Sequence, residues 1–179
     1  MNIFYLDTDP KTCATYHVDK HVVKMIVEYA QLLSTAHRVI DGRVTTVKTA
    51  SNRSRKIWIT DDDRNTQLYK STHVNHPSAI WVRQSLANYT WLFSLWSNLL
   101  EEYTFRYNKV HASSRLYHML ETAPDNIPVY EFTQPSLAMP SEYLCEDAIS
   151  AYRNYYKFGK THLHAWKNRS IPEWANVSY

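Results

Sequence analysis

Glycine is nearly absent from this chain, with only Gly42 and Gly159 among 179 residues. A glycine-rich phosphate loop, a dinucleotide-binding fingerprint and a helix-hairpin-helix turn each need several glycines close together, so all of these motifs are excluded. Any phosphate that the protein binds must therefore be held by side chains or by the free N–H groups of a helix N-terminus.

The chain also contains few cysteines, no long hydrophobic run at its start and only a small net charge. Cys13 and Cys145 are the only cysteines, and their spacing fits no metal site and predicts no disulfide framework. The first residues, MNIFYLD, contain no basic segment and no long apolar run, so we expect no signal peptide, no membrane span and an intracellular, cytoplasmic protein. A net charge of +3 does not demand a nucleic-acid partner, although it leaves room for a local basic patch.

Helical periodicity dominates what is present, and it predicts a mostly α-helical, single compact domain over residues 1–179. Asp9 and Pro10 predict the start of a first helix, as its N-cap and first residue, and Gly42 follows its expected end. We expect helices over 9–40, 76–107, 113–122 and 146–158. The second of these is long enough to kink or split. Residues 43–72 are expected to form a polar surface excursion and a candidate lid.

Two histidines, a lysine and a glutamate fall on one side of the first predicted helix. At about 100° per residue, His17, His21, Lys24 and Glu28 lie within roughly 60° of one another, with Lys20 at the edge of this stripe. A solvated polar face is one interpretation. An anion-binding or acid/base site that faces a cavity is the other, and we favour it because histidine is a poor filler for a face that merely contacts water.

A second charged cluster precedes the second predicted helix. His76 comes directly before its N-terminus, where free N–H groups and the helix dipole favour anions, and Arg83 follows about two turns later. A metal site is a further interpretation, since His17 and His21 have the i, i+4 spacing of helical zinc ligands. Because lysines that would repel a cation flank both histidines, we predict no metal and no other cofactor.

Three short blocks stand out along the chain: Asp19-Lys20-His21-Val22-Val23-Lys24, Asn75-His76-Pro77-Ser78-Ala79-Ile80-Trp81 and Tyr155-Tyr156-Lys157-Phe158-Gly159-Lys160. They resemble the first-helix motif, the Asn-His-Pro-x-x-x-Trp entry and the aromatic tail of the phage pyrimidine-dimer DNA glycosylase family and its uncharacterised relatives. In that family the first helix carries basic residues around a catalytic glutamate. The resemblance implies a helical domain of the pyrimidine-dimer DNA glycosylase type. It also implies a small bacteriophage protein that is located in the host cytoplasm.

The chain departs from this family at two positions that matter for its chemistry. His21 stands where the glycosylases place their catalytic glutamate. Those enzymes also attack the sugar with the α-amine of a small residue that is exposed after the initiator methionine is removed. Because Asn2 is large, we expect Met1 to remain. The resemblance therefore implies the fold and a basic cradle of Lys20 and Lys24 suited to phosphate, rather than glycosylase–lyase chemistry.

Two imidazoles and a lysine point to phosphodiester chemistry without a metal. With His17 and His21 as catalytic base and acid, a lysine would stabilise the developing charge and a ribose 2′-hydroxyl would be the nucleophile. The leading hypothesis is a phage-type, anti-defence protein that binds a phosphorylated nucleotide, such as a cyclic nucleotide immune signal. Cleavage of this ligand, as by a metal-independent phosphodiesterase, is left open beside simple binding. The expected ligand-binding and phosphate-binding residues are Lys20, Lys24, Glu28, His76 and Arg83.

Two other functions stay open at this point. A DNA glycosylase/lyase, or another enzyme that acts on DNA bases, is the first alternative, and its ligand would be a nucleic acid. A non-catalytic protein-interaction module is the second alternative. Sequestration and cleavage of a nucleotide ligand are both compatible with the residues of the stripe, and the aromatic side chains could stack on bases in either case.

Overall fold

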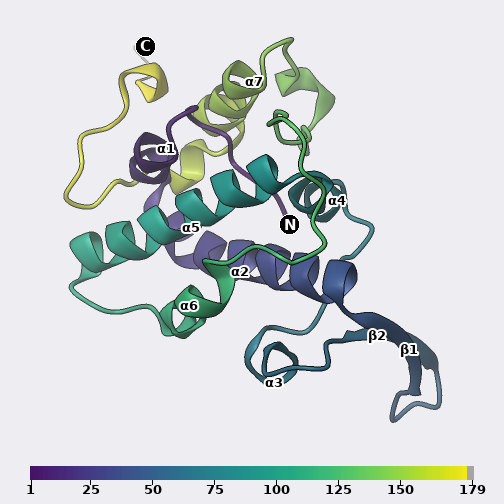
Figure 1. Ribbon diagram of the computed structural model, residues 1–179. Coiled ribbons are helices and arrows are strands. Elements are labelled where there is room, and N and C mark those ends of the chain that lie inside the picture. The colour runs from purple at the N-terminus through teal and green to yellow at the C-terminus, as the bar shows by residue number, and fades with distance from the viewer. Residues whose placement is uncertain (177–179) are drawn as a thin grey trace.

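The computed structural model describes residues 1–176 and is mostly helical (Figure 1). Helices make up 53% and strands 7% of it, so the prediction of a mostly α-helical chain is confirmed. The α-helices are α1 (Pro10–Tyr16), α2 (Asp19–Asp41), α3 (Arg64–Gln67), α4 (Pro77–Gln84), α5 (Leu86–Tyr107), α6 (Tyr117–Leu120) and α7 (Ala148–Asn154). The strands are β1 (Arg43–Lys48) and β2 (Ser54–Ile59). No helix of residues 1–176 is long and apolar enough to cross a membrane.

Several shorter helical segments complete the described chain. Four of them are 3-10 helices: η1 (Ala112–Leu116), η2 (Ser141–Tyr143), η4 (Thr161–Leu163) and η5 (Glu173–Ala175). The segment η3 (Tyr155–Gly159) is a π-helix that directly continues α7. The predicted helix over 146–158 is therefore seven residues of α-helix followed by this wider turn.

The first predicted helix is interrupted, and the expectation of one helix over 9–40 is wrong. Its start is as predicted, because the Asp9 carboxylate accepts a hydrogen bond from the Thr12 N–H at 2.8 Å and Pro10 is the first helical residue. The chain then leaves the helix at His17 and Val18, whose backbones are extended, and α2 begins at Asp19. His17 and His21 consequently belong to different segments, and the helical stripe does not exist as one continuous face.

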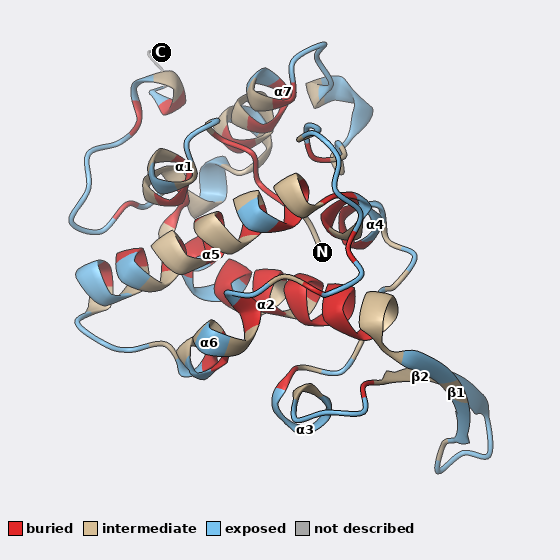
Figure 2. Ribbon diagram, viewed as in Figure 1, coloured by how far each residue is buried: buried red, intermediate tan, exposed pale blue. Residues whose placement is uncertain are grey.

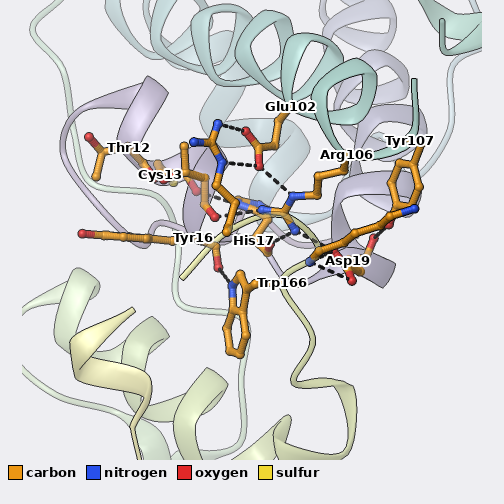
Figure 3. A network of polar contacts seen from close by, with 12 residues as sticks. Thr12, Cys13, Tyr16, His17, Asp19, Glu102, Arg106, Tyr107 and Trp166 are labelled. Carbon is orange, nitrogen blue, oxygen red and sulfur yellow. Dashed lines mark hydrogen bonds and ion pairs between the residues drawn. The ribbon is translucent and has the colours of Figure 1, made fainter. Parts of the chain in front are cut away.

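A buried arginine on α5 holds this interruption in place (Figure 3). The Arg106 side chain is fully buried, and its guanidinium donates to the backbone carbonyls of Thr15 and His17, each at 2.9 Å. These carbonyls lie at the end of α1, where the helix itself supplies no partner. The same guanidinium donates to the carboxylates of Asp19 at 2.8 Å and Glu102 at 2.6 Å. One cation therefore caps the end of α1 and fixes the start of α2.

The core lies where α2 and α5 pack against each other, and Figure 2 shows α2 as the most continuously buried helix. Apolar side chains of α2, among them Met25 and Ile26, are fully enclosed. The indole N–H of Trp96 on α5 donates to the Ile26 carbonyl at 2.9 Å, which ties the two helices together at their centre. The first residues, Ile3–Leu6, run through this core as a buried extended segment.

The second predicted helix is split, as its length allowed. Between α4 and α5 the Ser85 backbone is extended, and its hydroxyl caps α5 by accepting a hydrogen bond from the Asn88 N–H at 3.1 Å. The Leu86 N–H donates to the Pro128 carbonyl at 2.7 Å. This hydrogen bond to a later segment of the chain replaces the one that the Leu86 N–H would make within a continuous helix. Pro77 is the first residue of α4 and His76 is its N-cap, as predicted.

Residues 43–72, which were predicted as a polar surface excursion, contain regular secondary structure: an antiparallel hairpin of β1 and β2, followed by α3. Arg43 pairs with Ile59 at one end of the hairpin and Lys48 with Ser54 at the other. The hairpin projects from the helical body (Figure 1). Its base is held by Arg38 at the end of α2, whose guanidinium donates to the carbonyls of Trp58 at 3.2 Å and Leu68 at 3.0 Å.

Removal of the Arg106 guanidinium should destabilise the fold strongly. Arg106→Met leaves the buried Glu102 carboxylate with one partner fewer and two carbonyls without a donor, so we expect the free energy of unfolding to fall by about 3–5 kcal/mol. Urea denaturation followed by circular dichroism measures the change. Arg43→Met is the matched control, because the Arg43–Asp61 pair is exposed and should contribute less than about 1 kcal/mol. Similar losses in both variants would contradict this role.

Candidate functional site

His17 is enclosed in the core and has no free ring nitrogen. Its Nδ1 lies 2.8 Å from the Cys13 carbonyl oxygen and its Nε2 lies 3.1 Å from the Tyr29 hydroxyl. Burial lowers the pKa of His17 to about 4, so the imidazole is neutral near pH 7. Acid/base catalysis by His17 would require both hydrogen bonds to break. His17 is therefore a buried, fully hydrogen-bonded core residue and is not accessible to a ligand.

His21 is also largely buried, with 6% of the residue exposed. Its Nδ1 lies 2.6 Å from the Tyr156 hydroxyl, and its ring stacks on Phe4 with 4.4 Å between centroids. Burial is the main cause that lowers the pKa of His21 to about 3, and the positive charges of Lys160 and Lys24 add to the effect. Unlike His17, His21 keeps one ring nitrogen, Nε2, without a hydrogen-bond partner within residues 1–176.

The two lysines of the stripe lie at the surface, whereas Glu28 is half-buried. Lys24 is paired with Glu28, with 3.2 Å between Nζ and the carboxylate oxygen, and the Lys24 side chain is 68% exposed. The Lys20 side chain is exposed as well. The stripe therefore consists of two buried imidazoles, a half-buried glutamate and two exposed lysines. None of these five residues lines the two cavities described next.

Cations and one indole line a groove between the β-hairpin and the chain from Asn65 to His76. Two cavities of about 350 and 560 Å³ share Arg55, Trp58 and Ser71. The basic and aromatic residues that line this hairpin groove are Arg38, Lys48, Arg55, Lys56, Trp58, Lys70, His73 and His76. Among residues 1–176, no acidic side chain lines either cavity. The groove is therefore electrostatically suited to anions, and Trp58 offers a flat apolar surface beside the charges.

His76 lines the second of the two cavities. Its Nδ1 accepts a hydrogen bond from the Ser78 N–H at 3.2 Å, which caps α4. Burial and the positive charge of the Met1 ammonium group lower the pKa of His76, whereas the Glu28 carboxylate opposes this shift. Arg83 instead donates to the carbonyls of Val74 at 2.8 Å and Ala79 at 3.0 Å, so it braces the start of α4.

Trp58 and Lys70 are the groove residues that sequence reasoning missed. The alternation of Lys56, Ile57 and Trp58 fits a strand, but the polar residues around it favour a loop. In the structure these residues form a strand that pairs with β1, and Arg38 donates a hydrogen bond to the Trp58 carbonyl. Arg55 and Lys56 belong to the basic run of 43–72, for which a lid was expected, and they do line the groove.

No protein family, curated protein or solved structure matches this chain. The glycosylase-type fold and the family resemblance therefore stay predictions. In the part of the chain that the structure describes, we find no group of three or more metal-ligating side chains (histidine, cysteine, aspartate or glutamate) that could hold a metal ion.

The buried histidines should make the fold sensitive to acid. The pKa values of His17 and His21 are lowered as described, and burial together with Arg64 lowers the pKa of His37 to about 4. The unfolded chain takes up these protons near pH 6.5, so stability is complete above that pH and is lost as pH falls toward 4. We expect a loss of up to about 2 kcal/mol per histidine at pH 5. Urea denaturation at pH 7.5 and pH 5 tests this, and equal stabilities would contradict it.

Proposed function

We propose that this protein binds a phosphorylated nucleotide ligand in the hairpin groove. The observation that carries the proposal is a groove lined by cations and an indole without an acidic side chain. Arg55 and Lys70 in the first cavity would hold phosphate oxygens, and Lys56 would do so in the second, since both arginine and lysine donate charge-assisted hydrogen bonds. Trp58 would stack on a base, an interaction of about 1–3 kcal/mol per base.

The position of Trp58 supports a binding role for the hairpin. The Trp58 carbonyl is fixed by Arg38, and Arg38 also donates to the carbonyls of Tyr69 and Leu68 on the opposite wall. One buried cation therefore ties the two sides of the groove to each other. A groove whose walls are held in this way loses little conformational freedom when a ligand enters, and this favours affinity.

The geometry favours binding over cleavage by the two histidines. A general acid or base works best with a pKa near the working pH, whereas those of His17 and His21 are lowered to about 4 and 3. His17 also lacks a free nitrogen. The proposed activity is therefore capture of the nucleotide. A cyclic nucleotide immune signal is a ligand of this class, and its sequestration would serve an anti-defence role.

Loss of one groove cation should weaken nucleotide binding. Arg55→Ala removes a charged donor shared by both cavities, so we expect affinity to fall by about 1.5–3 kcal/mol, or at least tenfold. Isothermal titration calorimetry with a panel of cyclic dinucleotides and oligonucleotides measures the loss. Arg43→Ala is the matched control, because Arg43 lies on the same hairpin but pairs with Asp61 outside the groove lining. Equal affinities of Arg55→Ala and the unmodified protein would exclude the groove as the site.

One observation also favours the DNA glycosylase/lyase alternative. The Met1 ammonium group and the Glu28 carboxylate both act on His76, which lines the groove. In the resembled family an α-amine attacks the sugar and a glutamate assists. Glu28, rather than residue 21, would supply the carboxylate in this chain. A duplex that contacts the groove would then bring a damaged nucleotide toward the N-terminus.

Borohydride trapping separates the two candidate functions. If the α-amine attacks an abasic sugar, reduction should give a covalent protein–DNA adduct that peptide mapping locates at Met1. Glu28→Gln should reduce the yield of this adduct while leaving groove binding intact. Absence of an adduct, with nucleotide binding retained, would exclude the lyase function and leave the capture of nucleotides.

A further inference from the structure

A second pair of histidines lines the hairpin groove and is open to a ligand. His73 and His76 both line the cavity of about 560 Å³, together with Lys56. His73 is exposed and His76 is half-buried, whereas His17 and His21 are enclosed in the core. Two imidazoles beside a lysine are the residue types that cleavage of a phosphodiester without a metal uses.

The His73 ring is hydrogen-bonded at one nitrogen and free at the other. Its Nδ1 lies 2.7 Å from the Thr72 hydroxyl oxygen, and its Nε2 has no hydrogen-bond partner within residues 1–176. The tautomer with its hydrogen on Nδ1 donates to this hydroxyl and leaves a basic lone pair on Nε2. His73 therefore has the arrangement of a histidine that takes up a proton at Nε2.

The backbone that carries His73 is held firmly. The Thr72 N–H donates to the hydroxyl of the buried Thr35 on α2 at 3.2 Å, and the His73 carbonyl accepts from the His76 N–H at 2.8 Å. Arg83 donates to the carbonyl of the next residue, also at 2.8 Å. These contacts maintain a left-handed backbone at His73, with a φ of 47°, which is uncommon for a residue with a Cβ. Backbone strain of this kind is concentrated at functional sites.

His76 has the opposite hydrogen-bonding role. Its Nδ1 accepts from the Ser78 N–H, so the neutral ring carries its hydrogen on Nε2. This nitrogen has no partner among the residues that the structure describes, and it is a donor that cannot take up a proton. The cavity thus contains one histidine suited to accept a proton and one suited to donate a hydrogen bond.

We propose that the groove cleaves the ribonucleotide diester that it binds, with His73 as the general base. In this step, which rests on the proposed function, His73 Nε2 removes the proton of a ribose 2′-hydroxyl. The 2′-oxygen attacks the adjacent 3′-phosphorus, and the bond from phosphorus to the 5′-oxygen of the next nucleotide breaks. Water protonates the departing 5′-oxygen, and the hydroxide that remains takes the proton from His73. The products are a 2′,3′-cyclic phosphate and a 5′-hydroxyl.

The same cavity supplies groups that stabilise the negative charge of this step. The His76 Nε2–H is a neutral donor, and Arg55 and Lys56 add positive charge without an opposing carboxylate in the lining. The substrate class is a 3′–5′-linked ribonucleotide, either linear or cyclic. DNA lacks the 2′-hydroxyl, so the groove would bind it without cleaving it.

Cleavage of a 5′-phosphorylated diribonucleotide in the presence of EDTA tests the proposal. We expect the full-length protein to release a 2′,3′-cyclic phosphate, which phosphorus NMR detects. His73→Asn removes the base and should lower kcat by about 100-fold or more. The variant should still bind the 2′-deoxy analogue as tightly as the unmodified protein. His118→Asn, prepared in the same way, is the matched control and should keep the full rate, because His118 is an exposed histidine outside the groove lining.

His76→Asn separates the proposed donor from the helix cap. Asparagine is a preferred N-cap residue, so the start of α4 should be retained while the Nε2–H donor is lost. We expect kcat to fall by about 100-fold, as on removal of one donor to a developing oxyanion. His111→Asn is the matched control, since His111 Nδ1 accepts from the Ser113 N–H at 3.1 Å in the same capping contact, outside the groove. A full rate in His76→Asn overturns the donor role.

The outcomes distinguish this proposal from the proposed function. Binding of the diribonucleotide without cleavage, or an unchanged kcat in His73→Asn, overturns the catalytic role and leaves capture of the nucleotide intact. Loss of analogue binding in His73→Asn assigns the residue to binding and also overturns its role as a base. If the protein neither binds nor cleaves the diribonucleotide, the proposed function fails together with this inference.

Discussion

The buried guanidinium of Arg106 is the interaction on which the rest of the structure depends. It replaces the hydrogen bonds that a continuous first helix would have made, and it draws Glu102 and Asp19 into the same network. Burial opposes ionisation of Glu102, but hydrogen bonds from Arg169 and Arg106 outweigh it and lower its pKa. The C-terminal segment joins the network through the Lys167 N–H, which donates to Asp19. A single cation thereby joins α1, α2, α5 and the segment near residue 167.

This network also decides where the histidines lie. Because the chain turns at His17 and Val18, the His17 ring enters the core beside Tyr29, and His21 faces Phe4 and Tyr156. Arg38 has a comparable role at the other end of α2, where it holds the hairpin base by donating to carbonyls. Two buried arginines at opposite ends of α2 thus organise the two regions that carry the candidate sites. Each is stable in the interior because its donors are matched by carbonyl or carboxylate oxygens.

Signals that act within a few residues were read correctly from the sequence. Asp9 with Pro10, and His76 with Pro77, mark helix starts because caps and proline act on the next turn alone. The end of α2 before Gly42 follows for the same reason, and there the Arg38 carbonyl and the Ile59 backbone leave no room for a Cβ. The hairpin was missed because its strands are exposed and basic, so they lack the clean alternation of a half-buried sheet.

The sequence by itself determined the helical class, the helix starts at Pro10 and Pro77, and which histidine, lysine and tryptophan side chains the chain contains. The tertiary structure alone decided which of them are available to a ligand. His17 and His21 are four residues apart, yet the His17 ring has both nitrogens hydrogen-bonded, whereas the His21 ring has one nitrogen without a partner among residues 1–176. The physical reason is that burial and hydrogen bonding depend on partners such as Tyr156 and Arg106, which lie 135 and 89 residues from the histidines they contact. No local pattern encodes such distant partners.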